Sequence, residues 1–175
     1  ALGLTTPPLP RFFQWLGAIF TGDLGESLNY QKPVLSLITE RLQVSAFLAF
    51  GGLIVAILIS IPLGVFAARK HGTLLDPLVV TLSQFGAAIP SFWLGLMLIL
   101  LFSVELRWLP ASGYVPWDRD PIGTLRSLLL PTLALGFGQG AVMTRMTRAA
   151  MLDILSHDYI RTARGKGLPE SRTIR

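Results

Sequence analysis

Three stretches of the chain carry no charged side chain, and each of them is long and apolar. They cover residues 42–68, 77–104 and 127–144, with charged residues directly before and after each one. A helix needs about 20 mostly apolar residues, with a range of roughly 17 to 25, to cross the hydrocarbon core of a membrane. The pattern therefore predicts a transmembrane domain of 43–157. Its expected spans lie at about 44–68, 78–104 and 129–152, with a loop at 105–128.

The sequence before the first span predicts only short helices. Residues 12–20 repeat apolar side chains at helical spacing, and the run Gly22-Asp23-Leu24-Gly25 ends this pattern. Residues 33–41 begin with a proline, which suits the first turn of a helix. Both short helices fit the membrane surface, and both equally fit packing against the chain's own spans. Residues 1–42 are expected to form an extracytoplasmic or interfacial segment.

The charged residues predict an orientation. Only 14% of the residues are charged, against about 25% in an ordinary soluble domain. Positive charge gathers in the turn of 69–76 and again beyond residue 144, whereas charges of both signs balance in the other polar regions. Lys and Arg accumulate in cytoplasmic loops. We therefore expect the 69–76 turn and residues 158–175 in the cytoplasm, and the N-terminal region and the 105–128 loop outside.

The second span contains a predicted helix break. A proline at position 90 removes a backbone donor and clashes with the preceding turn, so the helix should kink or break at 88–91. Broken helices line the substrate path of many transporters. Candidates for a translocation pathway are Ser83, Gln84, Pro90, Ser91 and Gln139. Hydrogen bonding between helices, without any contact to a substrate, explains the same polar residues.

A short basic helix is expected after the third span. Ser156 or Asp158 suits its N-cap, and Gly167 suits its end. A basic helix fits three partners: nucleic acid, a groove in a soluble protein, or anionic lipid. Direct attachment to a membrane span argues against nucleic acid. Docking to a soluble partner and a purely topological role both stay open.

The residue types give no indication of catalysis. The chain has no Cys and two His; the two His lie on different segments, so no metal site is expected. It contains no Gly-x-x-x-x-Gly-Lys-Ser/Thr sequence, and the glycines of 136–140 lie inside an apolar helix rather than after a strand. The spans hold no paired carboxylates and no activated serine. We expect a non-catalytic protein that needs no cofactor.

Five short motifs resemble the membrane-spanning permease subunits of ABC importers for peptides and nickel. They are Gly22-Asp23-Leu24-Gly25-Glu26-Ser27, Ile61-Pro62-Leu63-Gly64-Val65, Ile89-Pro90-Ser91-Phe92-Trp93-Leu94-Gly95, Leu109-Pro110-Ala111-Ser112-Gly113 and Asp158-Tyr159-Ile160-Arg161-Thr162-Ala163-Arg164-Gly165-Lys166-Gly167. The last is similar to the loop that such permeases present to the ATPase, with the pattern Glu-Ala-Ala, three residues, Gly. Here Arg161 and Thr162 replace the Glu and the first Ala, while Ala163 and Gly167 match.

The resemblance implies an all-α polytopic bundle of about six spans with a cytoplasmic coupling helix. Three spans are present, so the chain is expected to be a fragment that lacks the first and the last two. The implied setting is the cytoplasmic (inner) membrane of a bacterium or archaeon. The implied partners are a second, homologous permease, two ABC ATPase subunits that hydrolyse the ATP, and an extracytoplasmic solute-binding protein. The residues implied to meet the ATPase are Tyr159, Ile160, Arg161, Thr162, Ala163, Arg164, Lys166 and Gly167.

Peptides are the cargo that this resemblance implies, with nickel chelates and glutathione as alternatives. The principal rival is a non-transporting membrane anchor or assembly subunit, whose basic tail binds lipid or a scaffold. The broken second span and its polar residues favour transport over an anchor.

Overall fold

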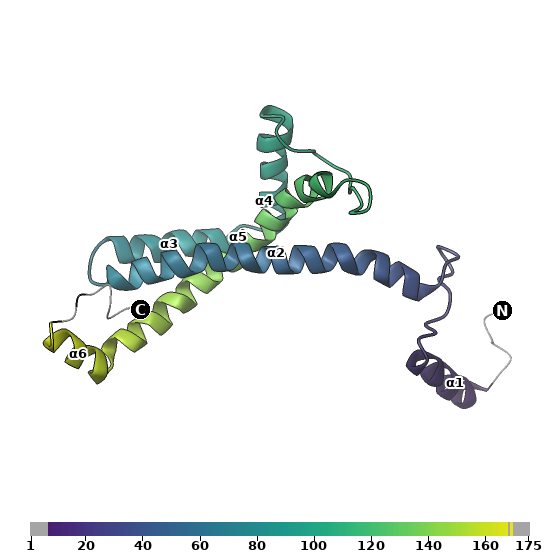
Figure 1. Cartoon of the computed structure of the whole chain (residues 1–175), viewed down its shortest axis with the longest axis horizontal. Coiled ribbons are helices and arrows are strands. Elements are labelled where there is room, and N and C mark those ends of the chain that lie inside the picture. Colours follow the sequence, from purple (N-terminus) through teal and green to yellow (C-terminus); the bar gives the residue numbers. More distant parts are fainter. Residues whose placement is uncertain (1–6, 168, 170–175) are drawn as a thin grey trace. The chain divides into compact units, whose positions relative to one another are not determined.

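The structure of the protein is a computed structural model that describes residues 7–167 and 169, and every regular element in that part of the chain is a helix (Figure 1). The elements are α1 (Pro8–Phe20), α2 (Val34–Arg69), α3 (Leu75–Ala88), α4 (Ser91–Ile99), the π-helical η1 (Leu100–Glu105), α5 (Pro121–Ser156) and α6 (Asp158–Gly165). The predicted all-α class is confirmed. Helices α2 and α5 are long and apolar enough to cross a membrane, and α3 with the following helix makes a third candidate.

The chain divides into two compact units, residues 1–47 and 48–175. In the first unit α1 ends at the predicted break, where Gly22 and Gly25 adopt φ of 84° and 74°. Only glycine takes up these angles without strain. The Asp23 carboxylate accepts a hydrogen bond from the Gly25 N–H at 2.9 Å and closes the turn.

Helix α2 is longer than the pattern indicates. Separate helices were expected at 33–41 and 44–68, but the structure has one continuous helix of 36 residues from Val34 to Arg69. No glycine or proline stands between the two expected pieces, so nothing interrupts the backbone hydrogen bonds there. Pro33 precedes the helix, and its carbonyl oxygen accepts the Leu37 N–H at 3.4 Å.

The third span was expected at about 129–152, but its helix α5 begins earlier, at Pro121, and Pro131 lies inside it. Asp120 is its N-cap, with a carboxylate that accepts the Ile122 N–H at 3.1 Å. The Thr124 hydroxyl donates to the carbonyl oxygen of Val115 at 2.7 Å and ties the preceding loop to the first turn. An Asp cap followed by Pro is a strong start signal, and it prevails over the second proline.

The predicted break in the second span is present. Helix α3 ends at Ala88, α4 begins at Ser91, and their axes differ by 90°. Ile89 is extended (φ −71°, ψ 121°), because a residue before proline avoids the helical region. The carbonyl oxygen of Pro90 then accepts the Leu94 N–H at 3.0 Å and starts α4.

Small residues allow α2 and α5 to touch at backbone distance. The buried residues Gly52, Ala56, Ser60 and Gly64 recur every fourth position along α2. A Cβ on Gly136 of α5 would lie 2.8 Å from the Gly52 carbonyl oxygen, and one on Gly64 would lie 2.9 Å from the Thr144 carbonyl oxygen. Small residues four apart are the usual means of close helix packing in membranes. We call this contact the small-residue seam.

Helix α5 also contacts α3, α4 and α6. Helices α3 and α4 both pack against it. A Cβ on Gly86 of α3 would lie 3.3 Å from Cε1 of Phe137 and 3.3 Å from Cβ of Ala141, so the contact between α3 and α5 is apolar and close here. The buried hydroxyls of Thr132 and Thr144 donate to carbonyl oxygens of α5 itself, at 2.7 and 2.8 Å. Helix α5 is therefore the common element of the unit.

The seam predicts that Gly136→Ala destabilises the protein. The added methyl would lie 2.5 Å from Cβ of Val55 and 2.8 Å from a backbone oxygen, so the helices must separate. Overpacking of this kind costs about 1–3 kcal/mol. Thermal unfolding of the purified membrane protein measures the effect. Gly138→Ala is the control, because its added Cβ would have no neighbour within 4 Å other than adjacent residues and the backbone of its own helix. Equal thermal stability of both variants would contradict the seam.

Candidate functional site

Helix α6 follows α5 after a single extended residue. His157 has φ −68° and ψ 149°, and it is both the C-cap of α5 and the N-cap of α6. Its ring Nδ1 donates to the Asp153 carbonyl oxygen at 2.7 Å, which satisfies one of the last acceptors of α5. The two residues that were expected to cap α6 do not cap it. The Ser156 hydroxyl donates to the Asp153 carbonyl oxygen of α5, and Asp158 is already the first residue of α6. A link this short leaves α6 little freedom to move independently of α5.

The end of α6 follows the prediction. Gly167 has φ 78° and donates its N–H to the Arg164 carbonyl oxygen at 2.9 Å. Lys166 donates to the Thr162 carbonyl oxygen at 3.0 Å. A left-handed glycine at this position stops a helix and satisfies its last carbonyl groups.

Helix α6 has one face held by the protein and one face open. Ile160 is 4% exposed and anchors the helix, whereas Tyr159 is 60% exposed. Of the other predicted coupling residues, Ala163 is half-buried, and those that are exposed are Arg161, Thr162, Arg164, Lys166 and Gly167. Nη1 of Arg161 lies 3.6 Å from Oδ1 of Asp158 on the same helix. Both side chains are exposed to solvent, so this ion pair contributes little to stability. The open face is therefore basic with one aromatic ring.

A groove of about 1060 Å³ lies beside α6. Its apolar wall comes from the ends of α2 and α5, including Phe66 and Leu155, and Arg164 of α6 borders it. Arg69, Lys70 and His71 from the turn between α2 and α3 line the same groove. A smaller pocket, of about 240 Å³, joins the 110–114 loop to residues 127–131 at the start of α5. The α2–α3 turn and α6 thus share one end of α5, and the 106–120 loop lies at the other.

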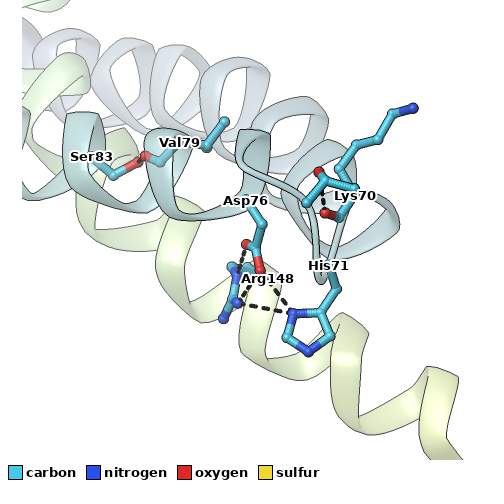
Figure 2. Close-up of polar contacts among 7 residues, drawn as sticks. Lys70, His71, Asp76, Val79, Ser83 and Arg148 are labelled. Carbon is cyan, nitrogen blue, oxygen red and sulfur yellow. Dashed lines mark hydrogen bonds and ion pairs between the residues drawn. The ribbon is translucent and has the colours of Figure 1, made fainter.

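An ion pair fixes that end of the bundle (Figure 2). Arg148 of α5 donates from Nε to Oδ1 of Asp76 at 2.5 Å and from Nη2 to Oδ2 at 2.6 Å. Asp76 stands in the first turn of α3, and its side chain is only 6% exposed. Nδ1 of His71 lies 2.8 Å from the same Oδ2. Two parallel hydrogen bonds to a shielded carboxylate fix both the distance and the angle between α3 and α5.

The sequence does not predict this pair. Asp76 and Arg148 lie 72 positions apart, and each is one charge among several near the end of an apolar stretch. The one local signal is Asp76 itself, a single acidic residue in the first turn of a helix. A favourable interaction with the helix dipole accounts for an acidic residue at that position equally well. Only the packing of α3 on α5 shows which arginine it meets.

The five pathway candidates are not joined in the structure. Ser83 is buried, and its hydroxyl donates to the Val79 carbonyl oxygen of its own helix at 2.8 Å. The other four are exposed: Gln84, Pro90, Ser91 and Gln139. Within residues 7–167 no side-chain hydrogen bond links these five to one another. Their role as a pathway stays a prediction.

Comparison with known proteins shows the family of the chain. The family model of the binding-protein-dependent transport system inner membrane component matches residues 60–175, which include α3, α4, α5 and α6. The chain belongs to this family. It is 43% identical over 169 residues to a peptide transport system permease protein of Brucella abortus (strain 2308), with 97% of this chain and 54% of the relative covered.

Other relatives in the family carry similar names. The oligopeptide transport system permease protein AppB of Bacillus subtilis (strain 168) is 39% identical, over 98% of this chain and 55% of the relative. The di/tripeptide transport system permease protein DppB of Pseudomonas aeruginosa (strain UCBPP-PA14) is 36% identical, over 99% and 57%. The chain spans about half the length of the curated relatives it matches. Family and apolar helices together make it a multi-pass inner-membrane protein.

The anchoring of α6 predicts the effect of Ile160→Ala. Loss of a buried branched side chain typically costs about 2–5 kcal/mol, so α6 should come loose from α5. Hydrogen exchange at the α6 amides is expected to speed up strongly, while exchange in the α2–α5 seam stays unchanged. Tyr159→Ala is the matched control, because this neighbouring side chain is exposed. Identical exchange in both variants would show that Ile160 is no anchor.

Proposed function

We propose that the chain is part of a permease subunit of an ATP-driven importer that moves peptides across the cytoplasmic membrane. The observation that carries the proposal is the position of α6. It is an exposed basic helix, joined through one residue to α5, in a chain whose family model covers the whole of this region. The peptide cargo is supported by the names of the relatives, which describe peptide, oligopeptide and dipeptide systems.

The partners follow from this proposal. A separate pair of ABC ATPase subunits hydrolyses the ATP and grips the open face of α6. A second, homologous permease completes the membrane part, and an extracytoplasmic solute-binding protein delivers the cargo. Tyr159 supplies contact area at the ATPase, Arg161 and Lys166 supply a charged rim, and Ile160 holds the helix from behind.

The mechanism is mechanical rather than chemical. When the ATPase pair closes, it displaces α6, and the short link at His157 passes the displacement to α5. Helices α2, α3 and α4 all contact α5 and move with it. The 90° break at Ile89–Pro90 gives the bundle a hinge, and the exposed Ser91 and Gln139 line the path of the cargo in this proposal.

The cargo is tested by uptake into vesicles that contain the intact complex, isolated from its native membrane together with its solute-binding protein. Labelled dipeptides and oligopeptides are expected to accumulate with ATP inside the compartment that holds the ATPase. Uptake of nickel chelates or glutathione in place of peptides would contradict the peptide assignment. No ATP-dependent uptake of any of these solutes would favour the membrane anchor.

Charge reversal on the open face of α6 is expected to uncouple the importer. With Arg161→Glu and Arg164→Glu in the intact subunit, uptake per ATP hydrolysed should fall about tenfold, within the usual range of a coupling free energy. Reconstituted vesicles allow both rates to be measured together. Arg126→Glu, an exposed arginine near the other end of α5, is the control. Full coupling in the double variant would remove α6 as the ATPase contact.

The proposed orientation places α6 inside the cell and the 106–120 loop outside. The 175 residues contain no cysteine, and the experiment replaces any cysteine elsewhere in the intact subunit, so that Lys166→Cys and Ser112→Cys report the two ends separately. A membrane-impermeant maleimide is expected to label Ser112→Cys in intact cells and Lys166→Cys only after lysis. Labelling of Lys166→Cys in intact cells would reverse the orientation and remove α6 from the ATPase.

A further inference from the structure

The Asp76–Arg148 pair lies between the two parts of the bundle that a transport cycle has to move together. Arg148 stands on α5 between two and three helical turns before His157, at about 3.6 residues per turn, so it belongs to the segment that carries α6. Asp76 lies in the first turn of α3, the helix that ends at the break at Ile89–Pro90. One side-chain contact thus connects the α6 end of α5 to the start of the broken helix.

The rest of the α3–α5 contact is of a different kind. Around Gly86 the two helices meet through apolar atoms of Phe137 and Ala141. Such contacts hold the helices together by close packing, and each single atom pair contributes only a small, non-directional attraction. The guanidinium–carboxylate fork is directional, since both of its hydrogen bonds are lost when the helices shift along each other. The fork therefore adds a directional restraint to the apolar contact between α3 and α5.

We propose that Asp76 and Arg148 are positioning residues that make α3 follow α5 when α6 is displaced, with His71 orienting the carboxylate. The inference rests on the proposed function, because it assigns a part of the path from the ATPase to the broken helix. The pair touches neither cargo nor nucleotide. It transmits a displacement, and its loss leaves α6 able to move α5 while α3 lags behind.

A simpler role for the same residues is topological, with Arg148 serving only as one more positive charge at the inner boundary. The two roles differ in what Arg148→Lys does. Lysine keeps the charge but presents a single ammonium group instead of a planar fork. The positioning role requires that Arg148→Lys uncouple the importer, whereas a topological charge predicts no effect.

The test uses the intact importer in proteoliposomes, with peptide uptake and ATP hydrolysis measured on the same samples. Asp76→Asn, Arg148→Gln and Arg148→Lys are expected to lower uptake per ATP hydrolysed about tenfold, while the rate of hydrolysis is retained. The exchanged pair, Asp76→Arg with Arg148→Asp, restores the fork in reverse and is expected to recover most of the uptake. Arg145→Gln, an exposed arginine on the same helix, is the control and keeps full coupling.

A second measurement follows the helices directly. Spin labels on Leu78→Cys of α3 and Met146→Cys of α5, both exposed positions, report the distance between the two helices. In the parental importer this distance is expected to be the same without nucleotide and in the vanadate-trapped state. With Asp76→Asn it is expected to change on trapping. A change in the parental importer would overturn the proposal.

Each remaining outcome also decides the matter. Normal coupling in Arg148→Lys overturns the positioning role, and so does normal coupling in both Asp76→Asn and Arg148→Gln. If the single variants fail to assemble and the exchanged pair does not rescue assembly, the residues are structural only, and the proposal fails. If the parental complex hydrolyses ATP without moving any solute, the proposed function fails, while the label distances still report whether α3 follows α5.

Discussion

The close approach of α2 and α5 is the constraint on which the rest of the second unit depends. Two helices meet at backbone distance where at least one of them presents no Cβ to the other, and Gly52, Gly64, Gly136 and Gly140 provide those places. In a membrane no hydrophobic force drives helices together, so van der Waals contact over such a seam supplies much of the association. With α2 held on one side of α5, the other faces of α5 are left for α3 and α4.

This arrangement makes α5 a single part with two functional ends. At one end Asp120 and Thr124 tie the loop before α5 to its first turn. At the other end the chain passes through His157 directly into α6, and Arg148 forms its ion pair with Asp76 of α3. A displacement of α6 therefore has short routes to the rest of the bundle: the rigid link, the small-residue seam and the ion pair. The proposed coupling to a separate ATPase uses connections of this kind.

The polar groups inside the bundle divide into two kinds. Thr132, Thr144 and Ser83 are buried but satisfied within their own helices, so they stabilise packing and are not exposed to a path. Gln84 and Gln139, in contrast, are exposed. The polar residues that shape the bundle are thus different from those that remain candidates for contact with the cargo.

The sequence by itself determined the helical class, the break at Pro90, the turn at Gly22–Gly25 and the stop at Gly167, because each depends on backbone chemistry within a few residues. It misplaced the starts of α2 and α5, where breakers and caps compete over longer stretches. Tertiary structure alone decided that Ile160 is an anchor rather than an exposed contact, and that Asp76 meets Arg148. Burial and partner choice depend on which helix faces which, and residues 72 positions apart carry no local signal of that.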